Sequence, residues 1–255
     1  MKILVLAIAG VLCFVCACKS RSAQQAPAGP SSAELVSQAN NFYRQRADLM
    51  QLREGIVSLR QAVTIDPGNY DASWQLAKFN YYLATHTDNN DERKKAFDEG
   101  IAAGKEAIAL QPGKPDGHFW LGAVYGAAAE RSILEGLASV NDIRHEMETV
   151  LQIDEGYQYG SAYMVLGLVY LNEPGIAGGD PNKAVELMEK GLRFGEGNAF
   201  LHLHLAEAYL KAGRPADARR QIDTIIAMKP DQDYLPEYNE ALAAARKLSE
   251  KTGGF

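Results

Sequence analysis

The chain has 255 residues, with 26 basic and 32 acidic side chains and a formal net charge of −6. No basic cluster is dense enough to suggest that the protein binds nucleic acid. The three cysteines, Cys13, Cys16 and Cys18, all lie near the N-terminus, so disulfides and thiol chemistry are excluded from the remaining chain.

Residues 1–17 have the layout of a secretory signal peptide: one Lys, a nearly unbroken apolar run, and then small residues. The run is too short to span a membrane comfortably. The segment from Val15 to Cys18 resembles the bacterial lipobox, in which the last Cys receives lipid and becomes the new N-terminus. Ala17 supplies the small residue that cleavage favours, so we predict lipid attachment at Cys18. The alternative is an ordinary cleaved leader with an incidental Cys.

The residue after Cys18 bears on location. In signals of this kind an Asp there keeps the protein at the inner membrane, and this chain has Lys19 instead. The resemblance therefore implies a lipid anchor on the periplasmic face of a bacterial membrane, the outer one if the cell has two. Residues 18–30 should form the lipidated Cys and a flexible tether, because this stretch is rich in Ser, Ala, Gln, Gly and Pro and has no apolar periodicity.

A folded domain is predicted for residues 31–255. It begins with a capping box, in which Ser31 and Glu34 satisfy backbone donors at a helix start. Helical periodicity then continues in paired segments. The interval between equivalent turn positions shrinks from 45 residues between Pro67 and Pro112 to 34 residues at the last pair. The extra residues are expected mainly between the two helices of each pair.

The last pair is the most regular. Leu205, Ala206 and Tyr209 lie on one face of its first helix, and the second helix carries Ala218 and ends before Pro230. This spacing resembles the tetratricopeptide repeat, which has Leu-Gly-x-x-Tyr on the first helix and Ala and Pro at fixed distances after it.

Two earlier pairs carry the same signature more fully. Leu121, Gly122 and Tyr125 form it in one pair, and residues 166–170 form it in the next. Asp180 followed by Pro181 predicts an N-cap and first turn. Residues 235–251 have one apolar stripe and read as a terminal capping helix. The predicted fold is all-α: a tetratricopeptide-like α-solenoid of about five helical hairpins plus this capping helix, about eleven helices in total.

The repeat resemblance also predicts a binding surface. In such folds the residues beside the signature face an inner groove, and here most of them are apolar. A groove that is open would bind a hydrophobic ligand, a partner helix or another copy of the protein. In the alternative, a long inserted helix fills the groove and buries these residues. The predicted groove residues are Phe79, Tyr82, Phe119, Ala123, Met164, Leu168, Leu171 and Leu203.

No catalytic constellation stands out, and we predict a non-enzymatic protein without cofactors or metals. His202 and His204 are two residues apart, so on a helix they cannot readily share a metal. The glycine-rich residues 175–180 lack the Gly-Lys-Ser/Thr ending of a phosphate loop. An enzyme would need polar groups from separate units to converge, for example Glu130 with residues 144–145.

Several longer motifs resemble the T-component family associated with TRAP transporters, over roughly residues 70–250. They are residues 119–123 after a Pro-Gly turn, residues 147–167, and residues 172–174 followed by residues 178–184. The resemblance implies a lipid-anchored periplasmic helical-repeat protein that pairs with a periplasmic solute-binding protein and forms homo-oligomers. The alternative function is a general envelope scaffold for outer-membrane assembly or export.

Overall fold

The computed structural model describes residues 29–129 and 133–251. The predicted signal peptide and Cys18 lie outside the described residues. The helices belong to one compact unit, Ser31–Phe255. Among the described residues, both hydrophobic clusters of the core are built from residues of this unit.

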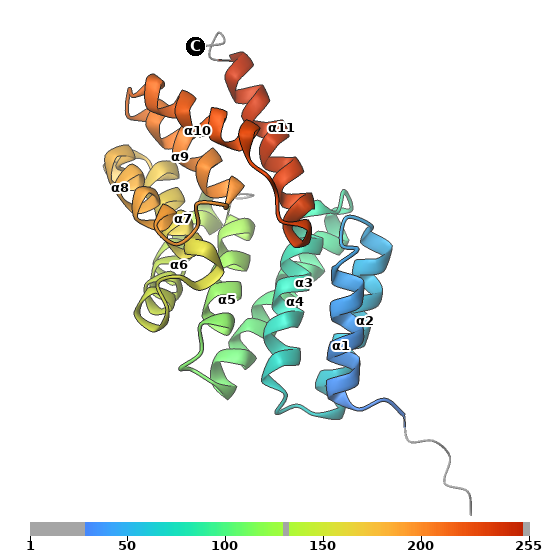
Figure 1. Cartoon of the computed structure of the whole chain (residues 1–255). Coiled ribbons are helices and arrows are strands. Elements are labelled where there is room, and N and C mark those ends of the chain that lie inside the picture. Colours follow the sequence, from blue (N-terminus) through green and yellow to red (C-terminus); the bar gives the residue numbers. More distant parts are fainter. Residues whose placement is uncertain (1–28, 130–132, 252–255) are drawn as a thin grey trace, which may run out of the picture. The chain divides into compact units, whose positions relative to one another are not determined.

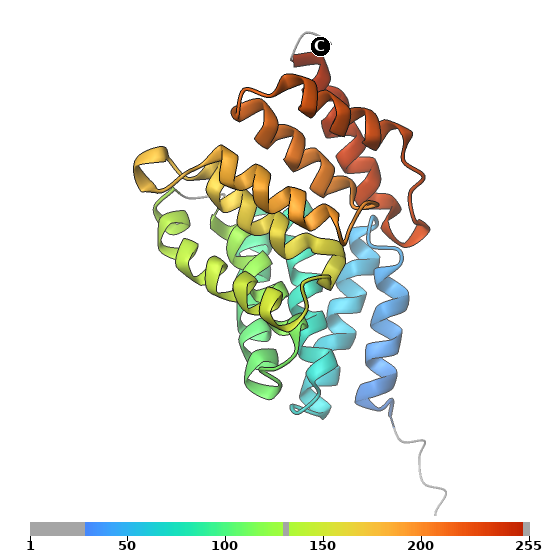
Figure 2. The same cartoon turned by 60° about the vertical axis from the view of Figure 1, so that its left-hand side comes forward.

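Eleven α-helices and two short 3-10 helices occur in the described part of the chain, which confirms the predicted all-α fold with five hairpins and a capping helix. Figures 1 and 2 show the hairpins following one another in chain order, with α11 laid against the last of them. The elements are α1 (Ser32–Tyr43), α2 (Leu49–Ile65), α3 (Tyr70–His86), α4 (Asn90–Leu110), α5 (Pro115–Ala129), α6 (Ile133–Ile153), α7 (Tyr157–Asn172), η1 (Gly175–Ala177), α8 (Pro181–Leu192), α9 (Ala199–Lys211), α10 (Pro215–Ala227), η2 (Gln232–Tyr234) and α11 (Leu235–Lys251).

The predicted helix starts are confirmed. The Ser31 hydroxyl accepts from the backbone N–H of Glu34, whose carboxylate accepts from the backbone N–H of Ser31 at 2.7 Å. Asp180 caps α8 by accepting two backbone N–H bonds, and Pro181 occupies the first turn, where its missing N–H costs nothing. These local signals fix where α1 and α8 begin.

Signature glycines set the distance between the helices of a hairpin. A Cβ at Gly122 would collide with the side chain of Met147, and one at Gly167 would lie 2.9 Å from Met188. Both methionines are fully buried. The two pairs occupy equivalent repeat positions, so the same glycine–methionine contact packs α5 on α6 and α7 on α8.

The extra residues of the longer repeats are placed differently from the prediction. Residues 173–180 do form a connector between α7 and α8 and contain η1. In the second hairpin, however, only three residues separate α3 from α4, and α4 has 21 residues. The added length there extends a helix, because Asn89 caps it early and no Gly or Pro breaks its first turns.

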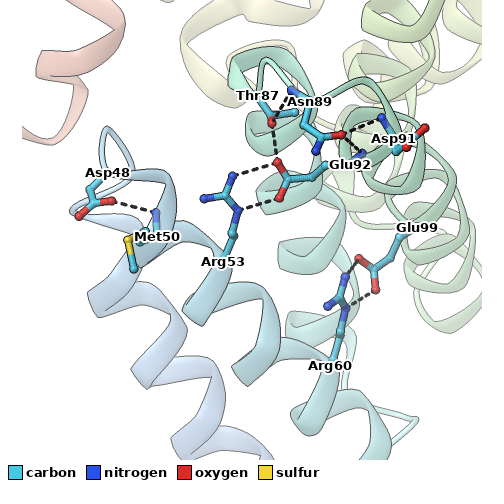
Figure 3. Close-up of polar contacts among 9 residues, drawn as sticks. All are labelled: Asp48, Met50, Arg53, Arg60, Thr87, Asn89, Asp91, Glu92 and Glu99. Atoms are coloured by element: carbon cyan, nitrogen blue, oxygen red, sulfur yellow. Dashed lines mark hydrogen bonds and ion pairs between the residues drawn. The ribbon is translucent and has the colours of Figure 1, made fainter.

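The second helices of the first two hairpins are joined by an ion-pair ladder. Arg53 and Arg60 on α2 make bidentate pairs with Glu92 and Glu99 on α4, with N–O distances of 2.6–2.9 Å (Figure 3). The two arginines are seven residues apart, and so are the two glutamates. The arginines therefore lie on one stripe of α2 and the glutamates on one stripe of α4. Because the arginines are well exposed, we expect each pair to add only about 0–1 kcal/mol.

The start of α7 has an unusual backbone. Gln158, Tyr159 and Gly160 have φ values of 48°, 55° and 73°, in the left-handed region that side chains disfavour. A Cβ at Gly160 would collide with the carbonyl oxygen of Gly191 on α8. The turn therefore brings two helix backbones into contact and needs glycine where they meet.

Candidate functional site

A cavity of about 1440 Å³ runs along the inner side of the stack. Its walls come from the first helix of every hairpin, together with α6, η2, α11 and adjoining turns, whereas α2, α4, α8 and α10 contribute nothing. The separate inserted helix that was considered as an alternative does not occupy this space among the described residues. The main apolar and aromatic lining residues are Tyr43, Tyr81, Tyr82, Phe119, Trp120, Ala123, Ala127, Val140, Met164, Val165, Leu168, Phe200 and Tyr234.

Five of the eight predicted groove residues line this cavity: Tyr82, Phe119, Ala123, Met164 and Leu168. They come from α3, α5 and α7 and lie at the repeat positions that predicted an inner surface. Their role in binding remains a prediction.

The other three, Phe79, Leu171 and Leu203, are not on the cavity wall but in the hydrophobic core, with exposures of 0%, 5% and 3%. The ring of Phe79, for example, fills the space that a side chain at Gly55 would need. Each inner helix carries two adjacent apolar stripes, and the sequence periodicity does not separate the stripe that faces a helix from the one that faces the cavity.

Polar residues that the sequence reasoning missed close one side of the cavity. Arg46, in the turn after α1, is buried and makes a bidentate pair with Glu237 on α11, with its Nε and Nη2 atoms 2.7 and 2.5 Å from the carboxylate. It also donates to the carbonyl oxygen of Asp233. This contact ties the first hairpin to the capping helix across 191 residues of sequence.

A second contact lies beside it. His86 at the end of α3 has Nε2 3.0 Å from a Glu240 carboxylate oxygen and Nδ1 2.8 Å from the carbonyl oxygen of Tyr82. Both partners are acceptors, so a doubly protonated imidazole satisfies both. Burial lowers the pKa of His86, but the bonds to Glu240 and Tyr82 outweigh it and the net effect raises the pKa.

Lys78 on α3 stands in the same wall, among aromatic rings. Its Nζ lies 4.0 Å from the ring centre of Tyr43, 5.6 Å from that of Trp120 and 6.0 Å from that of Trp74. Within the described residues it makes no ion pair and no hydrogen bond. Burial, and after it the nearby positive charge of Arg46, lower the pKa of Lys78 to about 8.

Two other histidines on first helices hold hairpins together. His118 contacts Glu146 through Nδ1 at 2.5 Å and the carbonyl oxygen of Pro112 through Nε2 at 3.0 Å. His202 stands at the equivalent repeat position and likewise contacts the preceding turn and the second helix. Their common position, three residues before the signature Leu, was the sequence signal for this structural role.

The described residues contain no group of three His, Cys, Asp or Glu side chains that could hold a metal. Glu130, which the enzyme hypothesis required, lies outside the described residues. Its proposed partner Arg144 pairs with Glu173 at 2.5 Å. The cavity thus combines apolar and aromatic walls with a few ionised groups, an arrangement that suits binding.

No helix in the described ranges combines the length and apolarity needed to cross a membrane.

Comparison with known families gives a match over residues 81–250 to the TRAP transporter T-component family. The chain belongs to this family. The T-component match covers most of the cavity wall, from the end of α3 to α11. Residues 34–122 also match the plant specific mitochondrial import receptor subunit TOM20 family, over the first hairpins.

Solved structures support the repeat fold. The crystal structure of TTC0263, a thermophilic TPR protein in Thermus thermophilus, is similar with a TM-score of 0.60 and 19% identity, over 82% of this chain and 99% of that one. The structure of Pseudomonas aeruginosa pilF is similar with a TM-score of 0.55 and 18% identity, over 88% of this chain and 95% of that one. At these identities the likeness shows only the fold. No curated protein sequence matches this chain.

Proposed function

We propose that this protein is a lipid-anchored periplasmic accessory of a TRAP-type solute uptake system, which contacts a periplasmic solute-binding protein and holds an apolar ligand in its inner cavity. Family membership indicates association with TRAP transporter components and a non-enzymatic binding role. The observation that supports the apolar ligand is the cavity of about 1440 Å³, which is large enough for a drug-sized molecule.

The anchor is the first part to test. Replacing Cys18 with Ala should abolish lipid attachment, because the thiol is the acceptor and no Cys follows it in the chain. Labelling with a fatty-acid analogue, followed by detergent partitioning, measures this. Cys16→Ala is the matched control and should still be labelled and processed. A labelled Cys18→Ala protein of processed mass would show that the lipid is attached elsewhere.

The partner is tested by crosslinking and affinity purification from native envelopes. Repeated recovery of a solute-binding protein would support the uptake role. Recovery of outer-membrane assembly or export proteins without a solute-binding protein would instead favour a general envelope scaffold. Sedimentation of the purified protein, alone and with the recovered partner, would show whether it forms homo-oligomers.

A further inference from the structure

Among the described residues, Lys78 has no acid partner, and the rings of Tyr43, Trp74 and Trp120 lie around its ammonium group. The other positive groups at that side have partners: Arg46 bonds to Glu237 and Asp233, His86 bonds to Glu240, and Arg44 donates to the Asn41 side chain. Ring faces attract an ammonium ion, but they replace only part of the hydration that burial removes. No described carboxylate lies close enough to Lys78 for a direct ion pair, although Glu237 and Asp116 act on it from farther away.

A neighbouring donor is also unsatisfied. The indole N–H of Trp120 is buried and has no acceptor within the described residues. The ring centre of Trp120 lies 5.6 Å from Lys78 Nζ. A buried donor normally has an acceptor, so the unsatisfied indole N–H of Trp120 near Lys78 indicates a place for an acceptor that a ligand would bring.

The rest of the lining limits the charge of that ligand. Carboxylates of Glu173, Asp233, Glu237 and Glu240 also line the cavity. With Glu196 and Asp231 they outnumber the lysines and arginines of the lining, which are Arg44, Arg46, Lys78 and Lys229. This excess of acidic side chains disfavours a head group with two negative charges. Beyond Lys78 the wall includes the apolar residues Ala123, Met164, Leu168 and Phe200.

From this arrangement we infer that the cavity binds an amphipathic monocarboxylate, with the carboxylate paired to Lys78 and the hydrocarbon body along α5, α7 and α9. The inference rests on the proposed function, because it assigns a chemical class to the apolar ligand proposed above. The head group would be the acceptor that Lys78 lacks, and the charge-assisted bond would select acids over neutral molecules of equal length.

The two tryptophans of the chain, Trp74 and Trp120, both lie within about 6 Å of Lys78 Nζ and provide the signal. Decanoate and decanol, which share a hydrocarbon chain, are titrated into residues 31–255 at pH 7 while tryptophan fluorescence is recorded. Decanoate should bind at least about 10-fold more tightly than decanol. Lys78→Met, which keeps an unbranched chain, should lose about 10- to 100-fold in decanoate affinity and leave decanol binding unchanged.

The matched control is Lys105→Met, since Lys105 is exposed on α4 and does not line the cavity. It should bind both probes as the unchanged protein does. If Lys78→Met binds decanoate normally, the inference is overturned, while the apolar ligand of the proposed function still stands. If decyl phosphate, with its second charge, binds as tightly as decanoate, the monocarboxylate assignment is overturned. If no probe binds, this inference and the ligand part of the proposed function both fail, but the uptake partner is tested separately by crosslinking.

Discussion

Met164 and Met188 offer a direct test of whether the cavity exists as open space. Both lie in the α7–α8 hairpin, but Met164 is half-buried on the cavity wall, whereas Met188 is fully buried against Gly167. In Met164→Glu the new carboxylate can reach the water of an empty cavity. We therefore expect the free energy of unfolding to fall by about 0–1.5 kcal/mol, the range of a partly exposed substitution.

In Met188→Glu the new carboxylate cannot reach water, because position 188 is fully buried. Enclosure of this kind raises the pKa of a carboxyl by up to about 3–5 units, and each unit corresponds to about 1.4 kcal/mol. Together with lost packing, this should cost about 4 kcal/mol or more at pH 7 and leave the domain largely unfolded. Urea titration of residues 31–255, followed by circular dichroism, measures both variants. A loss above about 3 kcal/mol for Met164→Glu would refute the reasoning and make Met164 part of the core.

Two further substitutions test the helix contacts. Gly160→Ala should destabilise the protein by about 2 kcal/mol or more, because a φ of 73° disfavours a side chain and the new Cβ would meet Gly191. The control Gly126→Ala has nothing within 4 Å of its new Cβ and should be neutral or stabilising by up to about 1 kcal/mol. Equal effects of the two substitutions on stability would contradict the backbone contact. The bond to Glu146 raises the pKa of His118 in the folded state, so its stabilisation is complete below about pH 6 and is lost as pH rises through the raised value. His118→Gln should therefore destabilise the protein at about pH 6 and have little effect on stability at about pH 8.5. Urea unfolding at each pH measures this, with His145→Gln, at an exposed position, as the control. The same loss of stability at both pH values would argue against a charged His118.

Local sequence signals were sufficient for the fold. Capping residues and the spacing of signature residues depend only on neighbours within one helical turn or one hairpin, so they can be recognised in the chain itself. The length of α4 was not predicted, because an insertion that continues a helix leaves the same spacing between turns as one that forms a loop. Its Asn89 cap was the signal that could have placed the helix start.

The cavity was predicted only in part, for a different reason. Tyr82 and Met164 were recognised because apolar residues at repeat positions mark an inner surface. Lys78 and Arg46 were not, because a charged residue in a helical sequence normally indicates a solvated face, and its enclosure depends on helices far away in the chain. The pairing of Arg46 with Glu237 requires the curvature of the whole stack, and a single sequence does not specify that curvature.

The bond between the first hairpin and the capping helix changes how the solenoid behaves as a chain of units. In an open array each repeat contacts only its neighbours, so folding can begin anywhere and spread, and a terminal repeat can fray independently. Here the bond between Arg46 and Glu237 joins the first hairpin to the last helix, so loss of α11 also removes a bonding partner from the first hairpin. We expect a contact over 191 residues to form late in folding, because the intervening chain must be ordered first. Truncation at the C-terminus should therefore destabilise the first hairpin, which in sequence follows the segment that is predicted to attach to the membrane.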